Sequence, residues 1–206
     1  MDSPSSCPIR SLPNCTVLPG AIDLLRNLSE HATPSTHLAI ASSASEAAFA
    51  KKTSQLPSLT ALIPTENRVF GDSPGMSDAR KKPAPDIFLL ALGKINKLVA
   101  AGGKDIVPEE CVVFEDSIAG VEAGRRAGMR VVWVPHPGLR EVCRGKEEAV
   151  LMGRSEGLDG MDKESGKENY GQGSEGIVSS DGWAEMLGSL DKFEFGTYGI
   201  NVSEHT

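Results

Sequence analysis

The chain has 206 residues, a formal net charge of −7 and a pI near 5.2, a length that suits one α/β domain with loops better than two separate cores. The acidic balance argues against a nucleic-acid partner, because phosphate backbones are bound by clustered Lys and Arg. Neither a bilayer-spanning apolar run nor a signal-peptide pattern in residues 1–20 is present, so we expect no membrane partner and a cytoplasmic location, with the nucleus as an alternative.

The first part of the chain predicts an irregular arm, a helix, a strand and a second helix. Residues 1–18 are rich in proline and small polar residues and predict an arm without regular structure. After Pro19-Gly20, apolar residues at helical spacing predict a short amphipathic helix; they are Ala21, Leu24, Leu25 and Leu28. The apolar run His37–Ala41 is typical of a buried parallel strand, and the Ser43-x-x-Glu46 pattern predicts the start of a helix that reaches Leu56.

The middle of the chain predicts further strands and helices in alternation. Residues 57–84 are rich in turn residues, with short strands predicted near Leu62–Ile63 and Val69–Phe70. Pro85 suits the first turn of a long amphipathic helix. Two buried strands, Cys111–Phe114 and Arg130–Val134, then flank another helix. Strand–helix–strand units of this length close as right-handed parallel crossovers, so we expect an α/β fold with a doubly wound, Rossmann-like parallel sheet.

The composition changes after this core. We place the core at residues 19–143. Residues 144–182 are rich in Gly, Ser and charged residues and predict a flexible surface insertion. Apolar residues return in 183–206, where we expect a C-terminal helix and a tail.

Polar residues stand at the ends of the predicted strands, which is where ligands bind in an open parallel sheet. Ser42 and Ser43 follow one strand, Lys82 precedes the long helix, and Glu115 and Asp116 follow the next strand. Hydroxyls and amides at a helix amino terminus hold phosphate oxygens, and a lysine neutralises their charge. Carboxylates supply oxygen ligands for Mg²⁺. Together the residues predict a phosphoryl site, with Ser42, Ser43 and Lys82 binding phosphate and Asp116 and Glu115 binding metal.

Each of these residues also has a simpler interpretation. Ser42 and Ser43 could be no more than a helix cap. Lys82 could be part of a solvated basic turn, and Glu115 with Asp116 could cap the next helix. The order of the three sites along the chain is what favours the phosphoryl site.

Longer segments around these residues resemble one family. Ile40–Ser43, Lys82–Phe88 and Val113–Met129 are similar to the second, third and fourth signature motifs of the haloacid dehalogenase (HAD) family, in the same order, and the resemblance covers about residues 17–140. Leu18–Ala21, with Lys52–Ser54, resembles the branch that includes pseudouridine-5′-phosphatase and sugar-phosphate phosphatases.

The resemblance implies a Mg²⁺-dependent phosphatase of small phosphate monoesters, such as sugar or nucleoside phosphates, acting through an aspartyl-phosphate. It implies that Ser42 binds phosphate, that Lys82 stabilises charge on the nucleophile and the phosphoryl group, and that Asp116 with Glu115 holds Mg²⁺. The expected partner is a small phosphorylated metabolite.

The sequence departs from the family in one respect that bears on catalysis. The family attacks its substrate with the first aspartate of a D-x-D-G motif on its first strand, and no D-x-D occurs in these 206 residues. The helical cap domain is also not recognisable. We therefore expect a core that is incomplete at its amino terminus, no turnover by the chain as written, and weak Mg²⁺ binding. The missing strand lies in the middle of the family's sheet, so we also expect an open sheet edge that could bind a protein partner.

Three interpretations remain open from the sequence. The chain is an incomplete member of an enzyme family, or a short non-catalytic product that binds phosphorylated ligands or a protein partner, or a receiver-like Rossmann binder. The position of Lys82 before the acidic pair, rather than on a later strand, disfavours the receiver.

Overall fold

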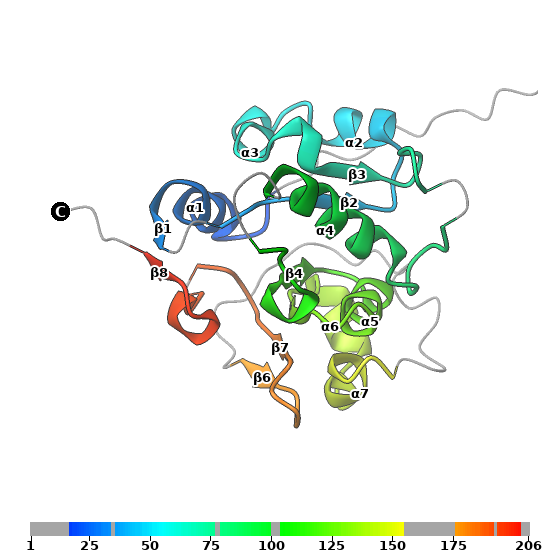
Figure 1. Ribbon diagram of the computed structural model, residues 1–206. Coiled ribbons are helices and arrows are strands. Elements are labelled where there is room, and N and C mark those ends of the chain that lie inside the picture. The colour runs from blue at the N-terminus through cyan, green and yellow to red at the C-terminus, as the bar shows by residue number, and fades with distance from the viewer. Residues whose placement is uncertain are drawn as a thin grey trace, which may run out of the picture.

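A two-stranded parallel sheet and a four-stranded, mostly parallel sheet form the centre of the fold (Figure 1). The computed structural model describes residues 17–33, 36–76, 79–99, 104–154, 176–191 and 193–202. One sheet pairs β2 (Ile40–Ser42) with β3 (Arg68–Phe70) in parallel. The other has the order β4-β5-β7-β6, in which β6 alone is antiparallel. The predicted α/β fold with parallel strands is confirmed.

Helices flank these sheets, and two short strands, β1 (Ala32–Thr33) and β8 (Asn201–Val202), pair with each other as a separate antiparallel sheet. The other strands are β4 (Val112–Glu115), β5 (Arg130–Trp133), β6 (Ile177–Val178) and β7 (Ala184–Met186). The α-helices are α1 (Ala21–Arg26), α2 (Glu46–Thr53), α3 (Pro57–Ala61), α4 (Asp86–Val99), α5 (Ile118–Arg126), α6 (Pro137–Val142) and α7 (Glu147–Leu151). A π-helical segment, η1 (Asn27–His31), and three 3-10 helices are also present: η2 (Thr65–Asn67), η3 (Pro108–Glu110) and η5 (Phe195–Tyr198). In the described residues, no helix is long and apolar enough to cross a membrane.

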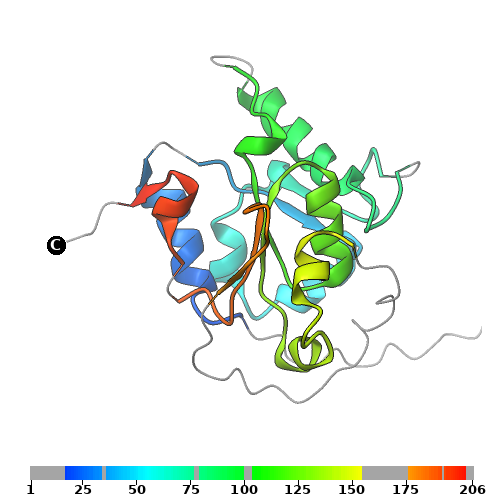
Figure 2. The same cartoon turned by 90° about the horizontal axis from the view of Figure 1, so that it is seen from below.

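Apolar side chains form two clusters, one on each face of the strands. The first includes Ile87 and Phe88 of α4, Val121 of α5, and Val113 and Val131 of the strands. The second joins α1 to the other strand face and to the carboxy-terminal segment through Leu24, Leu28, Val132, Val134, Leu190 and Phe193. Figure 2 shows the same arrangement, with the strands between α5 and α7 on one side and α1 and the carboxy-terminal segment on the other.

The predicted C-terminal helix is wrong. Ala184–Met186 is instead the strand β7, which pairs in parallel with β5. Ala184 and Met186 are buried while Glu185 between them is only half-buried, which is the period of two that a strand requires. Pairing with β5 also satisfies backbone groups that would otherwise lie unpaired at the edge of the sheet.

Two further predictions need correction in the regions between the main strands. Leu62–Ile63 is not a strand but lies in the turn that follows α3, where the side chain of Ile63 is buried. The ends of the predicted insertion 144–182 form α7 and β6, because Val150 and Leu151 of α7 are fully buried in the first cluster. Residues 155–175 of that segment and most of the predicted arm 1–18 lie outside the described residues.

Substituting Gly124 is expected to destabilise the fold, because this glycine lets α5 approach the sheet closely. A Cβ at position 124 would lie 2.8 Å from Cγ2 of Val131, inside a packed core. We expect Gly124→Ala to lower the free energy of unfolding by about 1–3 kcal/mol. Gly93 of α4 is the matched control: a Cβ there meets no atom within 4 Å, and Gly93→Ala should raise stability by about 0.5–1 kcal/mol through helix propensity. Urea unfolding of both variants checks this, and equal effects would contradict the close approach.

Candidate functional site

The turn that follows β2 holds Ser42 and Ser43 in a defined conformation. The Ser42 hydroxyl accepts a hydrogen bond from the Ala44 amide at 3.3 Å. Asp72, which lies just after β3, accepts from the Glu46 amide at 2.9 Å and so ties the start of α2 to the neighbouring strand. The predicted capping box is wrong, since Ser45 rather than Ser43 caps α2 and its hydroxyl accepts from the amide of Ala48 at 3.2 Å. Ser43 is exposed and Ser42 is half-buried.

Lys82 connects the ends of the two sheets. Its Nζ donates to the carbonyl oxygen of Ala41 in β2 at 3.2 Å and forms an ion pair with the carboxylate of Glu115 at the end of β4. The same ammonium lies 4.6 Å from the ring centroid of Phe88. Only 11% of the Lys82 side chain and 8% of the Glu115 side chain are exposed. A solvated basic turn therefore does not describe Lys82.

Glu115 is held on several sides. Its carboxylate accepts from the Ser117 hydroxyl at 3.2 Å as well as from Lys82. Burial raises the pKa of Glu115, although the ammonium of Lys82 opposes that shift. Gly120 lies against this carboxylate, where a Cβ would collide with it. The ionised form of Glu115 thus depends on Lys82.

Asp116 is exposed at the turn between β4 and α5. Its backbone carbonyl accepts a hydrogen bond from Nε1 of Trp133 at 3.2 Å, and Trp133 is fully buried in β5. Trp133 therefore fixes the acidic turn from inside the core. Sequence reasoning did not assign this role, although a tryptophan in a buried strand signals it, because its N–H needs an acceptor.

The structure brings the predicted site residues together only in part. Within the described ranges, the polar partners of Lys82 are the Ala41 carbonyl and Glu115, and no contact joins it to the side chains of Ser42, Ser43 or Asp116. Ala41 precedes Ser42 and Glu115 precedes Asp116, so Lys82 lies between the two turns that carry these residues.

The carboxylates are the correct type of ligand for Mg²⁺, but the set is small. Glu115 and Asp116 provide hard oxygen donors, yet Glu115 is engaged with Lys82. The described part of the chain contains no group of three or more His, Cys, Asp or Glu side chains that could hold a metal ion.

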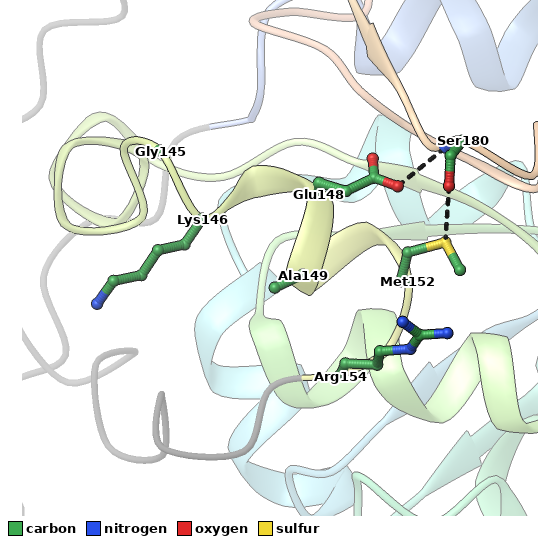
Figure 3. Close-up of a pocket in the computed structure, with 7 residues that line it drawn as sticks. All are labelled: Gly145, Lys146, Glu148, Ala149, Met152, Arg154 and Ser180. Atoms are coloured by element: carbon green, nitrogen blue, oxygen red, sulfur yellow. Dashed lines mark hydrogen bonds between the residues drawn. The ribbon is translucent and has the colours of Figure 1, made fainter.

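A pocket of about 430 Å³ lies elsewhere, between α7 and the turn that joins β6 to β7 (Figure 3). Its lining residues are Gly145, Lys146, Glu148, Ala149, Met152, Arg154 and Ser180. Glu148 accepts from the Ser180 amide at 3.0 Å, which attaches α7 to this turn. No lining residue belongs to the turns after β2 and β4, so the pocket is separate from the polar site.

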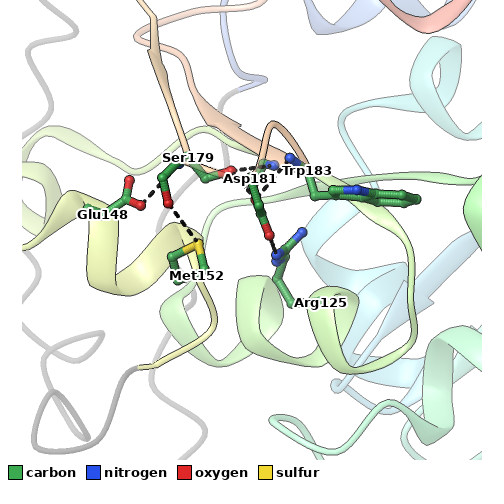
Figure 4. Close-up of polar contacts among 8 residues, drawn as sticks. Arg125, Glu148, Met152, Ser179, Asp181 and Trp183 are labelled. Atoms are coloured by element: carbon green, nitrogen blue, oxygen red, sulfur yellow. Dashed lines mark hydrogen bonds and ion pairs between the residues drawn. The ribbon is translucent and has the colours of Figure 1, made fainter.

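Next to this pocket, a polar cluster joins the same turn to α5 (Figure 4). Asp181 forms an ion pair with Arg125 and accepts hydrogen bonds from the Ser179 hydroxyl at 2.8 Å and the Trp183 amide at 3.1 Å. The ion pair and the hydrogen bonds of Asp181 give the cluster a structural role, although Nε of Arg125 is buried without a hydrogen-bond partner among the described residues.

Comparisons with known proteins relate the chain to one family of hydrolases. A model of the haloacid dehalogenase-like hydrolase family matches residues 9–128. The chain is 40% identical over 149 residues to a probable pseudouridine-5′-phosphatase of Saccharomyces cerevisiae, covering 72% of this chain and 59% of that protein. It is 38% identical over 138 residues to a probable pseudouridine-5′-phosphatase of Drosophila melanogaster, covering 67% and 54%.

A plant protein and a solved structure extend these similarities. (DL)-glycerol-3-phosphatase 1 of Arabidopsis thaliana is 36% identical over 139 residues, covering 68% of this chain and 42% of that protein. The crystal structure of CbbY from Rhodobacter sphaeroides in complex with phosphate gives a TM-score of 0.42 at 29% identity, covering 57% of this chain and 45% of that one. The chain spans 54–59% of the length of the two probable pseudouridine-5′-phosphatases.

Proposed function

Because this chain belongs to the haloacid dehalogenase-like hydrolase family, we propose that its complete form is a Mg²⁺-dependent phosphatase of small phosphate monoesters, such as sugar or nucleoside phosphates. The observation that carries the proposal is the buried Lys82, which joins the carboxyl ends of β2 and β4 through Ala41 and Glu115. The names of the similar proteins, probable pseudouridine-5′-phosphatases and a glycerol-3-phosphatase, support the substrate class.

Each residue of the site has a role in this proposal. The Ser42 hydroxyl and the backbone amides of the turn at Ser43 bind the phosphate oxygens. Lys82 neutralises the charge of the phosphoryl group and of the attacking carboxylate. Asp116, which is exposed, is the first ligand for Mg²⁺, and Glu115 is the second. When bound, Mg²⁺ would neutralise charge on the phosphoryl oxygens.

We expect this chain alone to bind Mg²⁺ more weakly than micromolar affinity. Mg²⁺ loses its hydration shell reluctantly and needs preplaced oxygen ligands. Here one carboxylate is exposed and the other already pairs with Lys82. Isothermal titration of the chain with MgCl₂ measures the affinity, and Asp116→Asn serves as the control that removes the accessible carboxylate. A micromolar dissociation constant for the unsubstituted chain would contradict the prediction.

The 206 residues supply no candidate nucleophile. They contain no D-x-D, and neither Ser42 nor Lys82 nor Asp116 replaces an aspartate that forms a covalent phosphoryl intermediate. We therefore expect no release of phosphate from an aryl phosphate by this chain with Mg²⁺. Turnover that is lost in Asp116→Ala would show that the chain contains a nucleophile after all.

A hybrid enzyme tests the proposed function. The 149 matched residues of the yeast relative would be replaced by those of this chain, and phosphate release from an aryl phosphate measured with Mg²⁺. We expect turnover that falls about 100- to 1,000-fold in Lys82→Ala and about 10- to 100-fold in Ser42→Ala. Ala50→Ser, on the exposed side of α2, is the matched control and should change nothing. A folded hybrid without turnover, or one indifferent to Lys82, would refute the assignment.

The open edges of the sheets favour a second candidate, in which the chain acts without catalysis. It would bind a phosphorylated ligand through Ser42 and Lys82, or a protein partner through a sheet edge. Titration of the chain with inorganic phosphate distinguishes the phosphorylated ligand from the protein partner. Phosphate binding that is lost in Lys82→Ala supports the phosphorylated ligand, and the absence of phosphate binding favours the protein partner.

A further inference from the structure

The turn that follows β3 continues the contact between the two strands of the two-stranded sheet. Pairing in register ends at Ser42 of β2 and Phe70 of β3. Beyond these residues, the Gly71 amide donates to the carbonyl of Ala44 at 2.9 Å. The turn after β3 therefore lies directly against the turn after β2, to which the proposed function assigns the phosphate.

Gly71 is required at this contact because the two turns approach each other closely. A Cβ at position 71 would collide with the carbonyl oxygen of Ser43. Glycine permits such an approach of one backbone to another. The colliding atom belongs to the main chain and cannot rotate away as the end of a side chain could, so a larger residue at position 71 would displace the turn that carries Ser42 and Ser43.

Asp72 holds the next part of the same turn. Its Oδ1 accepts from the Glu46 amide at 2.9 Å, and Glu46 is the first residue of α2. This amide has no acceptor within the helix, because the first amides of an α-helix lack one. The hydroxyl of the N-cap residue, Ser45, serves a different amide, that of Ala48. The start of α2 is thus fixed from two sides, by its own cap and by the neighbouring strand.

The turn that carries Asp72 is itself anchored. The Ser73 hydroxyl accepts from the Phe70 amide at 2.8 Å, and the Ser73 amide donates to the Phe70 carbonyl at 3.0 Å. The Met76 amide donates to the Ser73 carbonyl at 2.9 Å, and the Met76 side chain is buried. α2 lies beside β3, where the rings of Phe49 and Phe70 have centroids 5.0 Å apart (Figure 1). Asp72 is therefore held in a fixed place relative to α2.

The charge of Asp72 has the wrong sign for a residue that binds phosphate. Asp72 is exposed. A carboxylate at the amino terminus of a helix competes with a phosphate for the positive end of the helix dipole and repels it. The charge alone would therefore weaken phosphate binding. The bond to the Glu46 amide indicates that Asp72 acts through geometry instead.

We propose that Asp72 is a positioning residue for phosphate binding. It holds the Glu46 amide from the neighbouring strand and, together with Gly71, fixes residues 42–45 in the conformation that receives the phosphate. Asp72 itself does not contact the ligand. The proposal rests on the proposed function, because it assumes that the Ser42 hydroxyl and the amides of the turn at Ser43 bind phosphate.

Titration of the isotopically labelled full chain with sodium phosphate at low, constant ionic strength tests this role, with the amide resonances as the readout. Asp72→Ala is expected to raise the dissociation constant about three- to tenfold, because the turn loses one hydrogen bond. Asp72→Asn keeps an oxygen acceptor and removes the charge, so it should bind phosphate as tightly as the unsubstituted chain or up to about threefold more tightly. Glu66→Ala removes another exposed carboxylate, at the opposite end of β3, and should leave the affinity unchanged.

Amide exchange without phosphate separates positioning from a general loss of stability. In Asp72→Ala, exchange at Glu46 should accelerate about tenfold. Exchange at Val121, whose amide donates to the Ser117 carbonyl in the fully buried part of α5, should not change. Gly71→Ala should weaken phosphate binding in the same way as Asp72→Ala.

Three results would overturn the inference: phosphate affinity that is unchanged or higher in Asp72→Ala, equal weakening in Asp72→Ala and Asp72→Asn, or no phosphate binding by the unsubstituted chain. A folded hybrid enzyme without turnover, alongside phosphate binding that depends on Asp72, would refute the proposed function alone.

Discussion

Lys82→Met is expected to lower the free energy of unfolding by about 3–5 kcal/mol at pH 7, because it leaves the carboxylate of Glu115 buried without its partner. The side chain of Glu115 is only 8% exposed. Of its two side-chain donors, Lys82 and Ser117, only the hydroxyl of Ser117 would remain. The substitution also removes the donor to the Ala41 carbonyl and thus the link between the two sheets. Urea unfolding of the variant and the unsubstituted chain measures the difference.

The pH dependence of this loss has a definite sign. Burial already raises the pKa of Glu115 above its ordinary value, and removing Lys82 takes away the ammonium that opposes this shift. A carboxyl group whose pKa is raised in the folded state favours the fold below its unfolded pKa, near 4.3, and that contribution is lost as pH rises through the folded pKa. The defect of Lys82→Met should therefore shrink as the pH falls from 7 toward 5.

Glu115→Gln provides the matched control. It keeps an oxygen acceptor for Lys82 but removes the buried charge, so it should cost less than Lys82→Met. The double variant should recover most of the stability that Lys82→Met loses, since no uncompensated charge remains. If the free energy of unfolding of Lys82→Met lies within about 0.5 kcal/mol of that of the unsubstituted chain, the ion pair between Lys82 and Glu115 is no stronger than an ordinary surface salt bridge.

The candidate site was accessible to sequence reasoning because its residues follow apolar strands. Strand ends in a parallel sheet point to one edge, so Ser42 and Glu115 could be associated from their positions alone. Lys82 was harder to assign to the site from the sequence, since it lies in a loop beside Arg80 and Lys81. Only the structure shows that its side chain is the one of the three that is largely buried. The motif that it shares with a known family supplied what the local pattern lacked.

The carboxy-terminal region could not be predicted, because its local pattern is ambiguous. Trp183, Met186, Leu187 and Leu190 are spaced as on a helix, yet Ala184–Met186 forms a strand. Three residues are too few to establish a period, and the choice depends on β5, which offers an edge more than fifty residues earlier in the chain. The contact of Trp133 with Asp116 could not be predicted from local sequence either, since it joins residues 17 apart through a backbone carbonyl.

The separation into two sheets also follows from long-range pairing rather than from local pattern. The strand runs at His37–Ala41 and Cys111–Phe114 have the same apolar character as Arg130–Val134, so the sequence predicts equal burial for all three. In the structure, β5 is paired on both edges, whereas β2 and β4 are each paired on one. How deeply a strand of a parallel sheet is buried thus depends on how many strands pair with it. For this reason β2 is less buried than its apolar sequence predicts.

Asp181→Ala is expected to lower the free energy of unfolding by about 2–3 kcal/mol, because one carboxylate orders the turn between β6 and β7 and anchors it to α5. Asp181 accepts from the Ser179 hydroxyl and the Trp183 amide and pairs with Arg125, whose side chain is 15% exposed. Removing it leaves a largely buried guanidinium without this partner (Figure 4). Urea unfolding measures the loss, and the loss of the β6–β7 pairing should appear as faster amide exchange at Val178.

The charge of Asp181 adds a pH dependence of opposite sign to that of Glu115. Partial burial would raise the pKa of Asp181, but the hydrogen bonds from Ser179 and Trp183 and the charge of Arg125 outweigh it and lower the pKa. A carboxyl group with a lowered pKa stabilises the fold above its unfolded value, near 3.9, and this contribution is lost as pH falls through the folded pKa. Asp181→Asn keeps an acceptor for both hydrogen bonds, so it should lose less stability than Asp181→Ala at pH 7 and approach the unsubstituted chain in acid. An Asp181→Asn variant that is as stable as the unsubstituted chain at every pH would mean that the ionised carboxylate contributes nothing beyond its shape.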